Sequence, residues 1–219
     1  MNKIIEYCNS INKINNNIYF IKLRTDTELL PNFIQSFKHF VIAVDEWSRV
    51  IAKVTAYVPS YNERRVLVAN LFDENNGVES HVQTFEKFVE LLNSIVPIQK
   101  ENCQYALECT KEFVNGLHSI EASGDWIYAV AALGMIEYTY VTISKNIHQY
   151  VTKYTEKDIP HFAVHETLDV DHAIDLFKLV SNHYSTNEDQ IIAGIVKAYG
   201  LFDKFFSDIY ITLINDIKN

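Results

Sequence analysis

A chain of 219 residues, 48% of them hydrophobic, is long enough to bury a full core, and we expect one domain covering residues 1–219. The formal net charge of −9 argues against a nucleic-acid partner, because binding phosphates requires clustered lysine and arginine. No run of eighteen apolar residues occurs, so no membrane partner is expected. The cysteines, at positions 8, 103 and 109, lack CxxC spacing, which predicts no disulfide and a cytoplasmic protein.

The apolar residues recur every three or four positions, and only six glycines and four prolines interrupt them. This pattern is typical of an all-α protein. It predicts one long helix over about residues 33–58, ended by Pro59. A second helix is expected over about 62–77, where the stretch DENNG is typical of a helix end. Two further helices are expected over about 79–94 and 101–117.

The most apolar helix is predicted for the middle of the chain. The stretch SGD at residues 123–125 supplies a helix start, and the following pattern continues over 126–154. Because this helix is apolar almost all round, it should lie at the centre of the fold. The segment HFAVHETLDVDHAIDLF at 161–177 follows as another helical stripe, and a last long helix is expected over 187–217.

Glu137 is an ionisable residue inside the apolar central pattern. A carboxylate in such a place is costly unless it is paired, protonated or bound to a metal. It could also hydrogen-bond a tyrosine or face solvent, so this residue alone does not establish a site.

Two other groups of residues suggest partners for it. Glu74 at one helix end and His81 in the first turn of the next helix can converge on one point. His165, Asp169 and His172 are spaced so that they share one helix face. Each group taken singly is also compatible with a solvated helix face.

Together these three groups comprise three carboxylates and three imidazoles, and the groups lie on separate predicted helices. Mixed carboxylate and imidazole ligation in a helical bundle suits two iron or manganese ions, because carboxylates can bridge metals and leave positions open for O₂. The pattern therefore favours a metal site.

The stretches ANLFDENNGVESH, GMIEYTY and HETLDVDHA resemble motifs of the haem-oxygenase-like diiron oxidases and oxygenases. Members of that family show an NLxDExG helix end followed by a histidine, a glutamate on a central helix, and an HxxxDxxHA segment. The resemblance spans about residues 30–215 and implies a seven-helix, haem-oxygenase-like bundle. The metal ligands that it implies are Glu74, His81, Glu137, His165, Asp169 and His172.

The resemblance also implies a function. It predicts a non-haem diiron enzyme that uses two Fe(II), or Mn(II), with O₂ as co-substrate and an external reductant. We expect a small-molecule substrate, more in keeping with an amino-acid derivative than a long fatty acid, and N-oxygenation or cleavage of a C–C or C–N bond. We also expect a homodimer. The alternative from another class is a non-catalytic protein-interaction module on the same scaffold.

Some relatives in this family make para-aminobenzoate from one of their own tyrosines. Tyr19 lies roughly where they keep that tyrosine, and Tyr138 and Tyr140 flank the proposed ligand helix as possible accessory residues. Most buried tyrosines are only packing residues with a hydrogen bond. Lys145 lies two positions before the place of the lysine those relatives use, which Ile147 occupies here, and this argues against self-modification.

The remaining histidines are assigned no metal. His161 precedes His165 by four residues and could be a seventh ligand or donate a hydrogen bond to one, but we expect an exposed residue at a helix start. The others have no acidic residue at metal-binding spacing and are expected to be surface or packing residues: His39, His118, His148 and His183.

Overall fold

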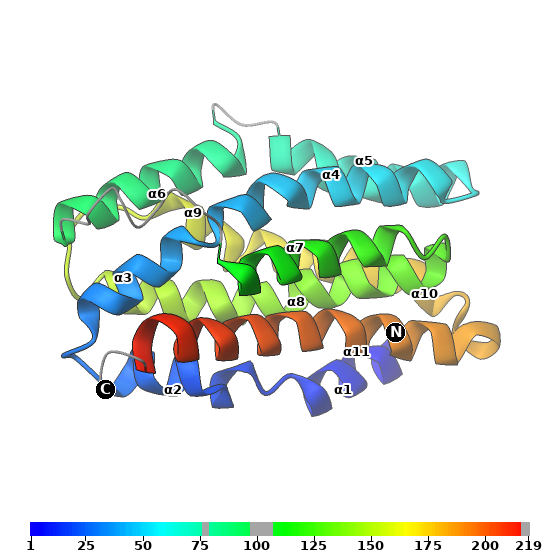
Figure 1. Cartoon of the computed structure of the whole chain (residues 1–219). Coiled ribbons are helices and arrows are strands. Elements are labelled where there is room, and N and C mark those ends of the chain that lie inside the picture. The colour runs from blue at the N-terminus through cyan, green and yellow to red at the C-terminus, as the bar shows by residue number, and fades with distance from the viewer. Residues whose placement is uncertain (76–78, 97–106, 216–219) are drawn as a thin grey trace.

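The computed structural model describes residues 1–75, 79–96 and 107–215, which form an all-α bundle (Figure 1). Within these ranges, seven helices contain fourteen or more residues, in agreement with the expected seven-helix fold: α4 (Val41–Tyr57), α5 (Tyr61–Asn75), α6 (His81–Ile95), α7 (Glu108–Glu121), α8 (Trp126–Val151), α10 (Leu168–Ser181) and α11 (Tyr184–Ile209). Four shorter helices complete the bundle: α1 (Asn2–Ile11), α2 (Ile18–Thr25), α3 (Leu30–Lys38) and α9 (Pro160–His165).

Helix α8 forms the centre of the bundle, as predicted. Asp125 caps its N-terminus, and the carboxylate accepts hydrogen bonds from the backbone N–H groups of Ile127 and Tyr128 at 3.0 and 3.1 Å. Gly124, with φ of 68°, supplies the preceding turn. By length and composition α8 could cross a membrane, but 78% of its most apolar window is buried inside the protein, which is typical of a core helix.

Helix α11 packs along α8, and Figure 1 shows α1 and α2 running beside α11. The two long helices approach closely at Gly194, where an added Cβ atom would overlap the backbone carbonyl oxygen of Tyr128. Helix α11 starts at Tyr184, before the predicted start, and has a kink at Asn187. It continues into a π-helical turn over Tyr210–Asn215.

The prediction of one helix over residues 33–58 is wrong, because the chain turns between α3 and α4. The N–H groups of His39 and Phe40 bond to carbonyl groups three residues back, each at 3.2 Å, which tightens the helix into a turn. No proline or glycine marks this position. Instead, the Phe40 ring stacks on the ring of Tyr140, with centroids 5.8 Å apart, so tertiary packing outweighs the local helical pattern.

The prediction of one continuous helix face over 161–177 also needs correction. The structure divides the segment into α9 and α10, and the N–H of Thr167 bonds to the carbonyl of Val164 at 3.1 Å in the tightened turn between them. His165 and Asp169 still face each other across this break, and a hydrogen bond joins their side chains. The two side chains therefore lie close together, as their spacing predicted, although the helix is not continuous.

Helix α7 ends at Glu121 and is described from Glu108, whereas the prediction was 101–117. Residues 101–106 of that predicted helix lie outside the described residues. Cys8 and Cys109 are buried free thiols, and Cys103 lies outside the described residues as well.

Candidate metal centre

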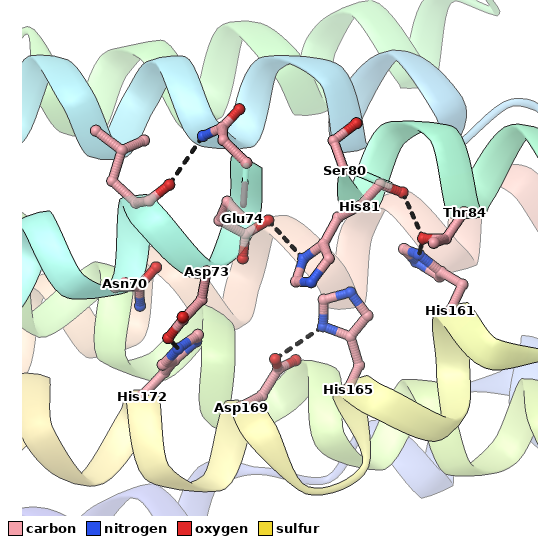
Figure 2. A network of polar contacts seen from close by, with 12 residues as sticks. Asn70, Asp73, Glu74, Ser80, His81, Thr84, His161, His165, Asp169 and His172 are labelled. Carbon is pink, nitrogen blue, oxygen red and sulfur yellow. Dashed lines mark hydrogen bonds and ion pairs between the residues drawn. The ribbon is translucent and has the colours of Figure 1, made fainter. Parts of the chain in front are cut away.

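Six buried polar side chains come together between α5, α6, α8, α9 and α10. Figure 2 shows five of them: Glu74, His81, His165, Asp169 and His172. None of the six residues is more than 9% exposed. They come from the end of α5, the start of α6, the middle of α8, the end of α9 and the start of α10. They are the residues that the family resemblance implied as ligands: Glu74, His81, Glu137, His165, Asp169 and His172.

Glu74 and His81 form one pair, with Nδ1 of His81 lying 2.8 Å from Oε2 of Glu74. A capping box formed by Ser80 and Gln83 sets the start of α6, so that His81 is its first residue. Burial acts to lower the pKa of His81. The hydrogen bond and the charge of Glu74 outweigh this effect and raise that pKa.

His165 and Asp169 form the second pair, with Nδ1 of His165 lying 2.8 Å from Oδ1 of Asp169. The His165 ring lies against that of His81, with centroids 4.4 Å apart, so the two pairs are neighbours. Burial, followed by the nearby His81 imidazole, lowers the pKa of His165 to about 3, which keeps this ring neutral. Burial and the charge of Glu74 raise the pKa of Asp169 well above its usual value.

Glu137 and His172 complete the group. Oε1 of Glu137 lies 3.9 Å from Nδ1 of His172 and accepts a hydrogen bond from Nδ2 of Asn70 at 3.1 Å. On the other side of the His172 ring, Nε2 lies 3.2 Å from Oδ2 of Asp73, and it donates a hydrogen bond to this carboxylate. One ligand atom each from Glu74, Glu137 and His172 lie within 4.8 Å of one another, close enough to share a metal ion.

The unpartnered atoms of this group fit a metal. The buried atoms without a hydrogen-bond partner in the described structure include Oε1 of Glu74, Nε2 of His165, Oδ2 of Asp169 and Nδ1 of His172. Each such atom costs about 1–3 kcal/mol when nothing satisfies it. Burial, then repulsion from Asp169 and Glu74, raises the pKa of Glu137 well above its usual value. Divalent cations would bond these atoms and neutralise the acids, and oxygen and imidazole ligands without thiolates suit iron or manganese.

A cavity of about 40 Å³ is lined by four of the six side chains: Glu74, Glu137, His165 and Asp169. A water molecule needs about 10–15 Å³ of such volume, so the cavity holds roughly three waters or one small molecule such as O₂. Typical pockets for organic ligands are roughly ten times larger. The wall opposite the polar side chains is mostly apolar and includes Phe40, Val44, Phe113, Leu117, Ile136 and Phe202.

The three tyrosines singled out in the sequence lie in different places. Tyr140 lines this cavity, and its ring centroid is 5.1 Å from that of His165. Tyr19 is buried beside a separate cavity of about 10 Å³, with its hydroxyl 2.6 Å from Oγ of Ser36. Tyr138 lines a surface groove instead and donates a hydrogen bond at 2.6 Å to an asparagine of α1.

The expectation of an exposed His161 is wrong, because this residue is only 2% exposed. Nδ1 of its ring lies 3.0 Å from Oγ1 of Thr84, and Nε2 lies 3.2 Å from the hydroxyl of Tyr140. The ring centroids of His161 and His165 are 4.5 Å apart. His161 therefore belongs to the surroundings of the candidate metal centre.

The other four histidines lie outside this group. His39 is buried at the turn between α3 and α4. His118, His148 and His183 each lie 3.2 Å or less from a glutamate oxygen, and all three side chains are partly exposed. These pairs join residues of different elements, so sequence spacing could not show them.

Sequence reasoning missed four residues around the candidate ligands. Asn70 lies four residues before Glu74, so helical spacing could have placed both on one face. Thr84 follows His81 by three residues on α6 and carries the same kind of signal. Asp73 and Trp47 carried none, because their partners come from other helices.

The arrangement of the long helices and the buried cluster of acids and imidazoles define a haem-oxygenase-like, all-α protein. Over residues 34–203 the chain matches the family of iron-containing redox enzymes, and it belongs to that family.

Comparison with individual proteins agrees with this assignment. The chain is 23% identical to the 4-aminobenzoate synthase of Chlamydia trachomatis over 188 residues, which cover 81% of this chain and 80% of that protein. Its fold is similar to that of a CADD-like protein from Nostoc punctiforme, with a TM-score of 0.77, 14% identity, and coverage of 97% of this chain and 98% of the other. It is also similar to a TenA homologue from Pyrococcus furiosus, with a TM-score of 0.59, 14% identity, and coverage of 95% and 96%.

Proposed function

We propose that this protein is an O₂-dependent non-haem oxidoreductase that holds two iron ions and oxidises a small external substrate. The observation that carries the proposal is the set of unpartnered, buried acid and imidazole atoms that face one another inside a bundle of the iron-containing redox enzyme family. Manganese is the alternative metal, because the same oxygen and nitrogen ligands suit it.

Two Fe(II) ions bound here would supply electrons to O₂, and an external reductant would return the iron to the Fe(II) state. The chain itself holds the ligands in place. Asn70 donates a hydrogen bond to Glu137, and Asp73 holds His172 with Nδ1 directed at the same acid. The apolar wall of the cavity limits the water that can enter and so protects oxidising chemistry from side reactions.

The cavity also bears on the substrate. Its volume of about 40 Å³ holds O₂ but no long chain, so an organic substrate has to displace some of the lining side chains. We therefore favour a small substrate, and we propose an amino-acid derivative that undergoes N-oxygenation or cleavage of a C–C or C–N bond. Tyr140 provides a polar group in the wall for such a molecule.

Self-modification is the second candidate, and the similarity to a 4-aminobenzoate synthase favours it. Tyr19 would be the tyrosine consumed. The surroundings of Tyr19 argue against this, because its hydroxyl is hydrogen-bonded to Ser36 and Ile147 lines the same small cavity. Lys145, the lysine nearest to that place in the sequence, is exposed.

Anaerobic titration of the full chain with Fe(II), followed by a pulse of O₂ with reductant, tests the proposal. We expect two Fe(II) per chain and rapid consumption of O₂. A chain that binds no iron, or that binds iron and consumes no O₂, would contradict the proposed function and favour the protein-interaction module.

A further inference from the structure

His161 lies between the candidate metal centre and two hydrogen-bonding side chains from different helices. Its ring is buried, and Figure 2 shows Thr84 of α6 beside it, at Nδ1. Tyr140 of α8 lies at Nε2. Tyr140 and His161 both line the cavity, together with four of the six acid and imidazole side chains. The direction of each hydrogen bond in the series Thr84–His161–Tyr140 follows from the number of protons that each group can donate.

The hydroxyl of Thr84 has one proton, which it donates to the backbone carbonyl of His81 at 2.9 Å. A carbonyl oxygen can only accept. The contact of 3.0 Å between Oγ1 of Thr84 and Nδ1 of His161 therefore requires the imidazole to donate from Nδ1. Thr84 thus selects the Nδ1–H form of His161.

The opposite nitrogen must then accept. His161 is 2% exposed and both ring nitrogens face hydroxyl groups rather than carboxylates, so a second proton would leave a buried charge without a counter-ion. The ring therefore carries one proton. Because that proton is on Nδ1, Nε2 has a lone pair. At 3.2 Å, the hydroxyl of Tyr140 donates its only proton to this lone pair.

We propose that His161 is a positioning residue that takes up the hydroxyl hydrogen of Tyr140, so that Tyr140 can only accept a hydrogen bond from a molecule bound in the cavity. The cavity then favours a small molecule with an O–H or N–H group on the side of Tyr140. A molecule that can only accept hydrogen bonds receives none from this tyrosine. The role of the cavity as a substrate site rests on the proposed function. The directions of the hydrogen bonds from Tyr140 to His161 and from His161 to Thr84 do not depend on it.

The first test uses metal-free protein labelled with ¹⁵N in histidine. NMR at neutral pH should show His161 with its proton on Nδ1, assigned by the loss of its signals in a His161→Phe variant. Thr84→Val should release this preference, whereas Thr84→Ser should retain it. A proton on Nε2 in the wild-type protein, or a doubly protonated ring, would overturn the proposal.

The second test uses nitric oxide as a small probe that only accepts hydrogen bonds, added anaerobically to the Fe(II)-loaded protein. A hydrogen bond donated to bound NO lowers its N–O stretching frequency. We expect the same frequency in wild type and Tyr140→Phe, because the hydroxyl of Tyr140 is already bonded to His161. His161→Phe should free that hydroxyl and lower the frequency, and the double variant His161→Phe/Tyr140→Phe should restore it.

Tyr138→Phe is the matched control, because Tyr138 lies two residues away on α8 and donates to α1 instead. It should leave the frequency unchanged in either background. A shift caused by Tyr140→Phe alone, or no shift in His161→Phe, would overturn the role assigned to His161. A protein that binds no iron but shows the expected NMR pattern would contradict the proposed function while leaving the directions of these hydrogen bonds established.

Discussion

Asp73 on α5 lies 3.2 Å from Nε2 of His172 on α10, although 99 positions separate them in the sequence. The Asp73 side chain is 44% exposed, whereas His172 is 8% exposed, so a surface acid reaches in to orient a buried imidazole. The result is that Nδ1 of His172 is directed at Glu137. Carboxylates that orient a metal-binding histidine in this way also increase its basicity.

Replacing Asp73 by alanine should weaken metal binding by about 10–100-fold, because His172 loses the group that sets its orientation. Anaerobic calorimetric titration with Fe(II) or Mn(II) measures this. Asp171→Ala is the control, because it removes the same charge from an exposed position next to His172 and should change the affinity little. Equal losses in both variants would show that only the overall charge matters.

Replacing His165 or His172 by alanine should remove at least one metal ion per chain, since each is proposed to bond a metal directly. Elemental analysis after loading with Fe(II) gives the count. His118→Ala removes a partly exposed imidazole paired with Glu46 and should retain the wild-type iron content. Full iron content in the first two variants would refute the assignment of the site.

Glu137→Gln should have opposite effects on stability with and without metal. The folded-state pKa of Glu137 is raised. The protonated acid therefore contributes stability that is fully present below the ordinary carboxyl pKa and is lost as pH rises through the raised folded-state pKa. Glutamine stays neutral and can still accept the hydrogen bond of Asn70. Without metal, the variant should therefore be more stable than wild type at neutral pH, and this advantage should vanish near the ordinary carboxyl pKa.

With metal present, only the wild type should gain stability, because a ligand stabilises the state that binds it. Denaturant unfolding across pH, with chelator and then with Mn(II), tests both effects. A variant that is less stable than wild type at neutral pH in chelator would indicate that Glu137 is instead a stabilising hydrogen-bond partner.

Tyr19 should survive turnover unmodified. Ser36 donates its own proton to the carbonyl of Phe33 at 2.7 Å, so the Tyr19 hydroxyl donates to Ser36 and acts as a packing residue with a hydrogen bond. Intact-protein mass spectrometry after Fe(II), reductant and O₂ should show an unchanged mass and many turnovers per chain. Loss of the Tyr19 side chain, together with activity abolished in Tyr19→Phe, would favour self-modification and leave the ligand assignment intact.

Gly194→Ala should destabilise the fold by at least about 1–3 kcal/mol, because the new methyl group would overlap the carbonyl oxygen of Tyr128 between α11 and α8. Gly200 lies on the same helix with open space around its Cβ position. Gly200→Ala should therefore stabilise the protein by about 0.5–1 kcal/mol through helix propensity. Thermal unfolding of both variants checks the contrast, and similar effects would show that the two helices are not closely packed at Gly194.

The sequence by itself determined the all-α class and the position of the central helix, because helical periodicity and an N-cap such as Asp125 are local signals. It also singled out Glu137, since an acid in an apolar helix stands out without knowledge of its neighbours. The spacing of His165, Asp169 and His172 predicted their convergence, because residues three and four apart lie on one side of a helix.

Only the tertiary structure decided where helices break and which groups surround the six side chains. The turn at Phe40 depends on its packing against Tyr140, and the burial of His161 depends on Thr84 and Tyr140 from other helices. Asp73 has its partner 99 positions away. Periodicity reports which side of a helix is apolar, but hydrogen bonds and ring contacts between helices depend on how the helices pack, and the sequence pattern of one helix does not contain that information.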